Sequence, residues 1–130
     1  MKEFTVQTTQ PAQFLDITGK VQQAVSAAVV NDGLCTVFIP HTTAGITIQE
    51  NADPDVVTDM LYALDKAVPL RDSHYRHAEG NTAAHMKASL LGSSVNVLVQ
   101  AGRLRLGTWQ GIYFCEFDGP RTRQVLVTIQ

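Results

Sequence analysis

The sequence predicts an α+β fold: a single domain over residues 1–130 with a β-sandwich-like antiparallel core and about three helices. Two patterns of apolar residues support this class. Several short segments alternate with period two, as strands do, and three longer segments repeat at helical spacing. A chain of 130 residues has the length of one domain and can bury a core without disulfides. We therefore expect strands and helices packed in layers.

The amino-terminal segment predicts strand and then helix. Phe4–Thr8 alternates, and Phe14–Ile17 resumes the pattern after a proline, which indicates a strand pair or one broken strand. Either Asp16 or Thr18 can cap the helix that follows. Its apolar residues recur at helical spacing until Asn31–Gly33 ends it.

Two strands are predicted next. Leu34–Ile39 is an almost continuous apolar run ended by Pro40, which is typical of a central strand buried on both faces. Gly45–Glu50 alternates and is expected to be the next strand.

A helix, a long loop and a short helix should follow. Asp53 can cap a helix that Pro54 begins and that stops before Pro69. Residues 69–80 are polar and without periodicity, which predicts a long loop, and such loops in compact domains are usually functional or mobile. Asn81 or Thr82 then starts a helix through residue 91.

From residue 95 onward the pattern is that of strands separated by turns, and we interpret it as an antiparallel meander. Cys115 in this half, and Cys35 in the earlier apolar run, each lie among apolar residues. We expect both thiols to be buried, unpaired and inert.

Composition limits the function classes. Hydrophobic residues make up 45% of the chain and no apolar run approaches the roughly 20 residues that span a bilayer. The amino terminus shows no export signal, so a cytoplasmic location without membrane contact is expected. Ten basic residues against twelve acidic ones give a net charge of -2, which disfavours nucleic acid as a partner.

Histidines mark the candidate site. His74, His77 and His85 are three of the four histidines in the chain and lie within one short polar stretch. His41 follows the apolar run that Pro40 ends, so two polar segments can meet. We predict that His41, His77 and His85 converge in one pocket.

Two chemistries suit this pocket, and the residues do not choose between them. Neutral imidazoles of the three histidines, with Glu79, suit a divalent cation such as Mg²⁺ or Zn²⁺, although no compact metal motif is present. Alternatively, Gly80-Asn81-Thr82 precedes a helix whose free N–H groups favour a phosphate. Arg121 and His85 would meet that anion as well.

Other polar residues have a structural and a functional interpretation. Asp53 and Asp55 are explained as helix-capping residues, whereas the preceding Glu50-Asn51 is typical of a strand end that faces a ligand. Trp109 is expected to pack rather than to contact a ligand, because aromatic side chains chiefly supply buried surface. A turn explains Glu116, Asp118 and Arg121 adequately.

Several longer motifs together resemble the YjbQ family of small proteins. The motifs are His41-Thr42-Thr43-Ala44, Glu50-Asn51-Ala52-Asp53-Pro54, His77-Ala78-Glu79-Gly80-Asn81-Thr82-Ala83-Ala84-His85, Gly107-Thr108-Trp109-Gln110-Gly111-Ile112 and Glu116-Phe117-Asp118-Gly119-Pro120-Arg121. The resemblance implies a compact α+β fold, a homotrimer and a secondary thiamine-phosphate synthase activity. Family membership does not by itself establish the physiological reaction.

The resemblance therefore leads us to expect a transferase that joins a hydroxymethylpyrimidine diphosphate to a thiazole phosphate. One alternative is a non-catalytic trimer that binds a phosphorylated metabolite or a divalent metal, and another is a metal-dependent hydrolase. The sequence does not decide whether the chain is an enzyme. The predicted catalytic residues are His41, His77, His85 and Glu50, and the three histidines are also the candidate metal ligands. The predicted substrate-binding residues are Asn51, Glu79, Gly80, Asn81, Thr82, Trp109, Gln110 and Arg121.

Overall fold

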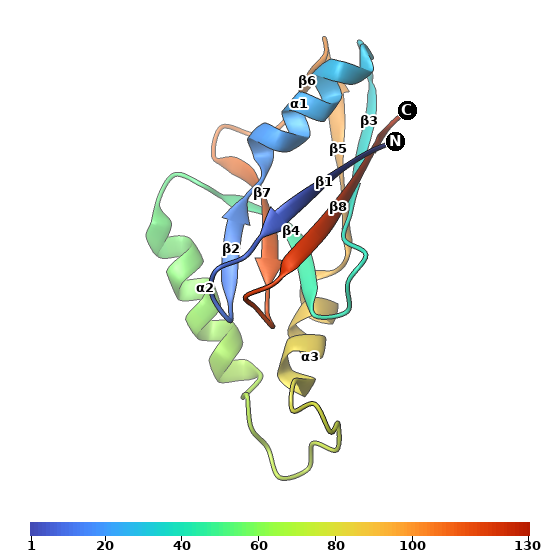
Figure 1. The fold of residues 1–130 in the computed structure, drawn as a ribbon. Helices are drawn as coiled ribbons and strands as arrows, with labels where there is room; N and C mark the ends of the chain where they lie inside the picture. Colours follow the sequence, from blue (N-terminus) through green and yellow to red (C-terminus); the bar gives the residue numbers. More distant parts are fainter.

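In the computed structural model, which describes residues 1–130, eight strands form two antiparallel sheets and three helices cover them (Figure 1). The strands are β1 (Lys2–Gln7), β2 (Gln13–Asp16), β3 (Gly33–Phe38), β4 (Ala44–Glu50), β5 (Ser94–Gln100), β6 (Arg103–Leu104), β7 (Gln110–Glu116) and β8 (Thr122–Ile129). The helices are α1 (Thr18–Ala28), α2 (Pro54–Ala67) and α3 (Thr82–Leu91). The predicted α+β class is confirmed.

The main core lies between the two sheets. One sheet has five strands in the order β1-β8-β3-β5-β6, and the other has three in the order β2-β7-β4. Apolar side chains from both sheets and from α1 meet between them, and they include Val37, Ile46, Phe114 and Val127. The sandwich-like core predicted from the alternating segments is therefore present.

A second, smaller core covers the outer face of the three-stranded sheet. Phe14 of β2 and Tyr113 of β7 pack there with Ala84 and Ala88 of α3. The apolar side of α2 packs on the same cluster through partly buried side chains such as Leu61. The central strand β7 is thus buried on both faces, and its neighbours place α3 beside the end of β4.

The predicted carboxy-terminal meander is wrong. Only β5 and β6 form a hairpin, while β7 pairs with β2 and β4 in one sheet and β8 pairs with β1 and β3 in the other. The chain changes sheet in the same way between β1 and β2, so the amino-terminal segment is one broken strand and not a pair. Alternation identifies a strand but does not encode its partner, which is why the sequence misled here.

The expectation that β3 is buried on both faces is also wrong. Cys35 and Val37 point into the core, whereas Leu34 and Phe38 on the opposite face are exposed. The apolar run therefore includes side chains on the outward face of β3, and no other part of this chain covers that face.

Only some of the predicted helix N-caps form the expected capping hydrogen bonds. Asp53 caps α2 by accepting a hydrogen bond from the backbone N–H of Asp55 at 2.9 Å, as predicted. The α1 N-cap is Ile17, and Asp16 instead accepts from the backbone N–H and hydroxyl of Thr18. Asn81 is the N-cap of α3 but makes no capping hydrogen bond, which frees its side chain for another contact.

Both cysteines are free and buried, as predicted. Burial raises the pKa of the Cys35 thiol to about 11 and raises the pKa of Cys115 still further. Neither side chain is a ready nucleophile.

None of the helices combines the length and the apolar character that crossing a membrane requires.

Candidate functional site

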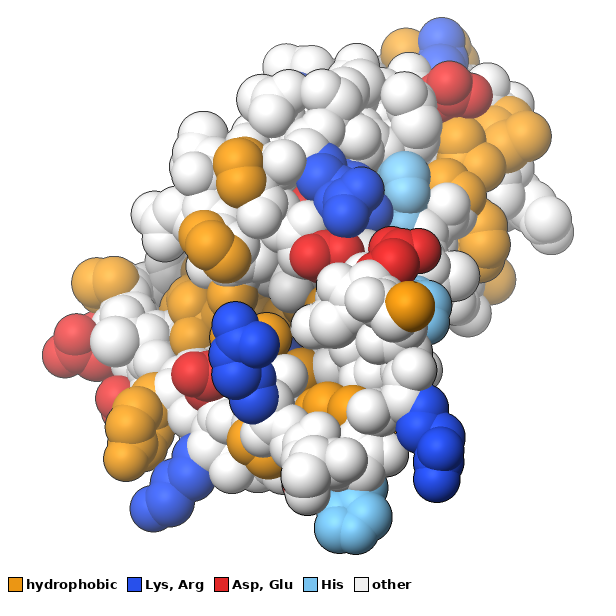
Figure 2. Space-filling model, turned by 60° about the horizontal axis from the view of Figure 1, so that its bottom comes forward, with side chains coloured by type: hydrophobic (Ala, Val, Ile, Leu, Met, Phe, Trp, Pro, Cys, Tyr) orange, Lys and Arg blue, Asp and Glu red, His pale blue; other side chains and the backbone are white.

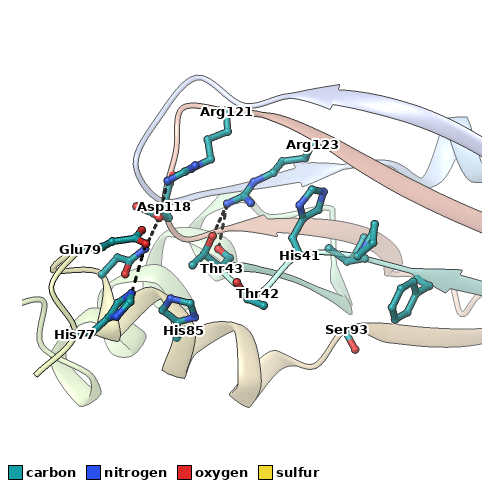
Figure 3. Close-up of a pocket in the computed structure, with 14 residues that line it drawn as sticks. His41, Thr42, Thr43, His77, Glu79, His85, Ser93, Asp118, Arg121 and Arg123 are labelled. Carbon is teal, nitrogen blue, oxygen red and sulfur yellow. Dashed lines mark hydrogen bonds and ion pairs between the residues drawn. The ribbon is translucent and has the colours of Figure 1, made fainter. Parts of the chain in front are cut away.

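A single cavity of about 640 Å³ gathers three of the four histidines. We call it the histidine–arginine pocket, and it is lined by Phe38, Ile39, Pro40, His41, Thr42, Thr43, His77, Glu79, Asn81, His85, Ser93, Asp118, Arg121 and Arg123. Figure 3 shows the imidazoles of the loop and of α3 on one side and the two guanidinium groups on the other. On the face drawn in Figure 2, basic, acidic and histidine side chains gather together.

The connection between β3 and β4 carries His41, whose hydrogen bond assigns its tautomer. The backbone N–H of Gln124 donates to His41 Nε2 at 2.9 Å, so Nε2 carries no proton. The neutral ring must therefore carry its proton on Nδ1. Burial lowers the pKa of His41, the charge of Arg123 lowers it further, and the Glu116 carboxylate acts in the opposite direction. His41 thus supplies the pocket with a neutral Nδ1–H donor.

The opposite wall is formed by the long loop and the first turns of α3. His77 and His85 lie edge to face with ring centroids 5.3 Å apart and an interplanar angle of 82°. The carboxylate of Glu79 lies 3.9 Å from His77 Nε2, and a protonated His77 would pair with it. The remaining loop histidine, His74, points into solvent and contacts Asp72 instead.

A buried ion pair forms the floor of the pocket. Glu116 has no exposed surface, and both of its oxygens accept hydrogen bonds from Arg123. Thr8 donates to the same carboxylate at 2.8 Å, and the backbone N–H of Asp118 donates at 3.0 Å. Arg123 also donates to the hydroxyl of Thr43 at 2.9 Å. Burial alone would raise the pKa of Glu116, but these hydrogen bonds and the Arg123 charge together lower it.

The turn between β7 and β8 places Arg121 at the rim. Its Nε donates to the Asp118 carbonyl at 2.7 Å and one Nη donates to the Asp118 carboxylate at 2.9 Å. Asn81 donates to the same carboxylate at 2.8 Å, which ties the start of α3 to this turn. The Oδ1 atom of Asn81 is buried and has no hydrogen-bond partner. The site therefore contains one acceptor that the protein itself leaves unsatisfied.

The predicted three-histidine metal site does not fit this arrangement. A metal ligand must offer an unprotonated ring nitrogen, and the one on His41 already accepts from Gln124. No group of three or more His, Cys, Asp or Glu side chains is placed to hold a metal ion. His77 and His85 alone supply two ring nitrogens. A divalent cofactor, Mg²⁺ or Zn²⁺, stays a prediction.

The predicted site residues divide between separate places. Glu79, Asn81 and Arg121 join the three histidines in the pocket, whereas Gly80 lines a neighbouring hollow of the long loop and Thr82 begins α3. Four others lie at the far end of β4 and β7, where Glu50 is opposite Gln110 in the strand register and Asn51 accompanies Trp109. Trp109 is 64% exposed, so its predicted packing role is wrong.

Sequence reasoning missed the buried pair on the pocket floor. Glu116 shares one face of β7 with Ile112 and Phe114, and Arg123 shares one face of β8 with Val125. Alternate residues of a strand point to the same face. The even spacing of these two charged residues from apolar core residues could therefore have predicted that both point inward.

Comparison with known proteins decides the family. The model of the family described as "UPF0047 protein YjbQ-like" matches residues 2–130. The chain belongs to the YjbQ family. The YugU relative of Bacillus subtilis is 54% identical over 95% of this chain and 93% of its own, and a UPF0047 protein of Methanocaldococcus jannaschii is 44% identical over 98% and 91%.

Solved structures agree with the fold of this YjbQ chain. A YjbQ/UPF0047 protein of Clostridium acetobutylicum has a TM-score of 0.98 and 55% identity over the full length of both chains. The conserved hypothetical protein TT1486 of Thermus thermophilus has a TM-score of 0.93 and 43% identity, again with full coverage of both.

These comparisons correct the predicted thiamine-phosphate synthase function, which is wrong. The YjbQ relatives carry only the UPF0047 name, and no such activity is assigned to them. The structure also assembles no group of metal ligands for the transferase or for the metal-dependent hydrolase.

Proposed function

We propose that the histidine–arginine pocket binds a small phosphorylated metabolite. The observation that carries this proposal is the convergence of two guanidinium groups and a fixed imidazole N–H on one cavity. Unprotonated phosphate oxygens accept hydrogen bonds, and charge-assisted hydrogen bonds from arginine match them well. A cavity of about 640 Å³ suits a small metabolite.

Each guanidinium keeps donors for a ligand. Arg121 uses Nε and one Nη on Asp118, and Arg123 uses Nε and one Nη on Glu116 and Thr43. The Nη1 atom of each arginine forms no hydrogen bond within the protein. A guanidinium has five N–H donors, so donors remain on both side chains that line the cavity.

The other walls favour a ligand that also carries a hydroxyl or amine. Glu79 and Asp118 line the cavity with carboxylates that an anion alone would avoid. A metabolite with a phosphate toward Arg121 and a hydroxyl or amine donor toward these carboxylates satisfies both sides. The two carboxylates therefore favour a phosphorylated molecule that also carries a hydrogen-bond donor over a bare anion.

Calorimetric titration tests the proposal with glycerol 3-phosphate, inorganic phosphate and unphosphorylated glycerol. We expect glycerol 3-phosphate to bind wild-type protein more tightly than inorganic phosphate does, and glycerol not to bind. Arg121→Gln should weaken phosphate binding about 10-fold, because it removes charge-assisted hydrogen bonds. Arg105→Gln, which removes an exposed arginine outside the pocket, is the matched control. Absent phosphate binding, or equal weakening by both variants, would reject the proposal.

We also propose that the chain assembles as a homotrimer. The outward face of the five-stranded sheet supports an interface, because Leu98 lies opposite Leu34 across β5 and β3 and both are exposed. Phe38 continues this apolar face and is paired with Leu126 of β8. Such an uncovered apolar face is typical of a protein–protein contact. Light scattering coupled to size exclusion measures the mass, and a monomer or dimer at micromolar concentration would contradict the proposal.

A further inference from the structure

A second concavity lies at the far end of β4 and differs in character from the histidine–arginine pocket. Its volume is about 490 Å³, and it is lined by Glu50, Ala52, Asp53, Pro54 and Trp109. No lysine, arginine or histidine lines it. Its chemistry is therefore that of one indole ring and two carboxylates.

The indole is exposed although its backbone is firmly held. The carbonyl oxygen of Trp109 accepts from the backbone N–H of Asn51 at 3.0 Å. The turn on its other side is closed by Gln110, whose N–H donates to the Gly107 carbonyl while its side-chain oxygen accepts from the Gly107 N–H at 2.8 Å. With the side chain 64% exposed, this sole tryptophan presents a large apolar ring to solvent from a fixed position.

Both carboxylates are positioned but unpaired. One oxygen of Glu50 accepts from the backbone N–H of Asp53 at 3.1 Å, and one oxygen of Asp53 accepts from the backbone N–H of Asp55 at 2.9 Å. Neither forms an ion pair with any side chain of the protein. Each carboxylate therefore keeps one oxygen that forms no hydrogen bond within the protein.

The pKa of the neighbouring Tyr113 is affected by these carboxylates. Burial raises the pKa of its phenol, and the carboxylates of Asp16 and Glu50 raise it further. The hydroxyl donates to the Glu50 carbonyl at 3.2 Å, so it contacts the end of β4. The potential at this end of the molecule favours a cation.

We propose that the concavity formed by Trp109, Glu50 and Asp53 is a binding site for a small organic cation of the alkylammonium or guanidinium class. The face of an indole attracts such cations, and nearby carboxylates add a charge of the required sign. A weakly hydrated organic cation gains from contact with the ring, whereas Na⁺ or K⁺ keeps its water. The site is independent of the phosphate proposal, since no residue is shared between the two cavities.

The fluorescence of Trp109 reports binding directly, because the chain has no other tryptophan. Wild-type protein is titrated with choline chloride, with methylguanidinium chloride, and with NaCl at equal ionic strength. The neutral isostere of choline, 3,3-dimethylbutanol, is the control for apolar binding alone. We expect a saturable change with an organic cation at a Kd on the order of 1 mM, and none with NaCl or the neutral isostere. The cation that binds more tightly identifies the class.

Variants distinguish binding at this specific site from nonspecific attraction of cations to acidic side chains. Glu50→Gln and Asp53→Asn remove charge while keeping an oxygen for the backbone hydrogen bonds, and each should weaken binding at least about 3-fold. Asp59→Asn removes an exposed carboxylate outside the concavity and should leave affinity unchanged. Trp109→Leu, followed by saturation-transfer NMR of the cation, should abolish measurable binding. No saturable change up to about 50 mM, equal binding of the isostere, or equal weakening by Asp59→Asn would overturn the proposal.

Discussion

At the scale of single residues, the pocket depends on charges that the core would normally exclude. Glu116 and Arg123 lie on inward faces of strands that otherwise carry Ile112, Phe114 and Val125. Desolvating both charges is costly, and the pair persists because hydrogen bonds satisfy them. The same hydrogen bonds hold the turn that carries Arg121, so one buried carboxylate positions the rim of the pocket.

We predict that Arg123→Met destabilises the protein by about 3–5 kcal/mol, because it leaves Glu116 buried without its partner. The double variant Arg123→Met/Glu116→Leu should recover much of this loss, since neither charge then needs compensation. Urea unfolding of the single and double variants measures both effects. Arg105→Met, at an exposed position, should stay within about 0.5 kcal/mol of wild type. A double variant no more stable than Arg123→Met would contradict the explanation.

His41 should make stability depend on pH. Its pKa is lowered in the folded state from the ordinary value of 6.5, so the unfolded chain binds this proton first as pH falls. The stability is therefore complete above about pH 6.5 and is lost progressively as pH falls toward the lowered folded value.

We predict that His41→Gln removes this part of the pH dependence, because glutamine does not titrate but can still accept from the backbone N–H of Gln124. Urea unfolding of both proteins at several pH values above and below 6.5 tests this. The stability advantage of wild type over the variant should shrink as pH falls. Parallel profiles for the two proteins would show that His41 does not titrate as the structure indicates.

For single residues, the sequence predicted which side chains lie close together better than it predicted their protonation, hydrogen bonding or burial. Neighbouring histidines and a following helix start placed His77, His85 and Asn81 together, since short segments constrain their own geometry. The tautomer of His41 depends on a backbone N–H of residue 124, far away in the sequence, and no local pattern encodes that contact. The predicted burial of Trp109 was wrong for a different reason. Residue type gives only an average burial, whereas a tight turn holds this tryptophan outward.

At the scale of elements, the close contact of α3 with β4 sets the position of His85. The backbone N–H of Ile46 donates to the carbonyl of Gly92 at 3.0 Å, which attaches the end of the helix to the strand. This approach needs a glycine at position 45, because an added Cβ would lie 2.7 Å from the Gly92 oxygen and 3.3 Å from the Ala88 oxygen. Only a backbone shift could relieve such a contact.

We predict that Gly45→Ala costs about 1–3 kcal/mol of stability and also weakens phosphate binding, since α3 must move and carries His85 with it. Thermal unfolding and calorimetric titration of the same sample measure the two effects. Gly19→Ala is the matched control, because nothing lies within 4 Å of a Cβ added there. The idea fails if Gly45→Ala retains wild-type stability.

Elements were predictable where local chemistry defines them. The Asp53-Pro54 start of α2 and the predicted end of α3 at residue 91 agree with the observed helix limits. Strand partners were not predictable, because pairing joins segments far apart in the sequence, such as β1 with β8. For that reason the sandwich-like class was correct while the meander was not.

At the scale of the whole molecule, three surfaces remain for partners: the histidine–arginine pocket, the concavity around Trp109, and the outward face of the five-stranded sheet. Phe38 belongs to the sheet face and also lines the pocket. A neighbouring subunit on that face would therefore cover one side of the pocket. Assembly and ligand binding should be coupled if the homotrimer forms.

We predict that Leu98→Lys dissociates the proposed trimer while leaving the fold intact. Leu98 is 66% exposed on the single chain, so lysine there meets water and costs the monomer little. In a trimer the same charge would be buried against a neighbour without a partner, which is strongly unfavourable. Light scattering should show a fall from trimer to monomer mass with an unchanged circular dichroism spectrum. Leu70→Lys, a similarly exposed leucine of the long loop, should leave the mass unchanged. If Leu98→Lys remains trimeric, the contact uses another surface, and the coupling to the pocket through Phe38 is excluded with it.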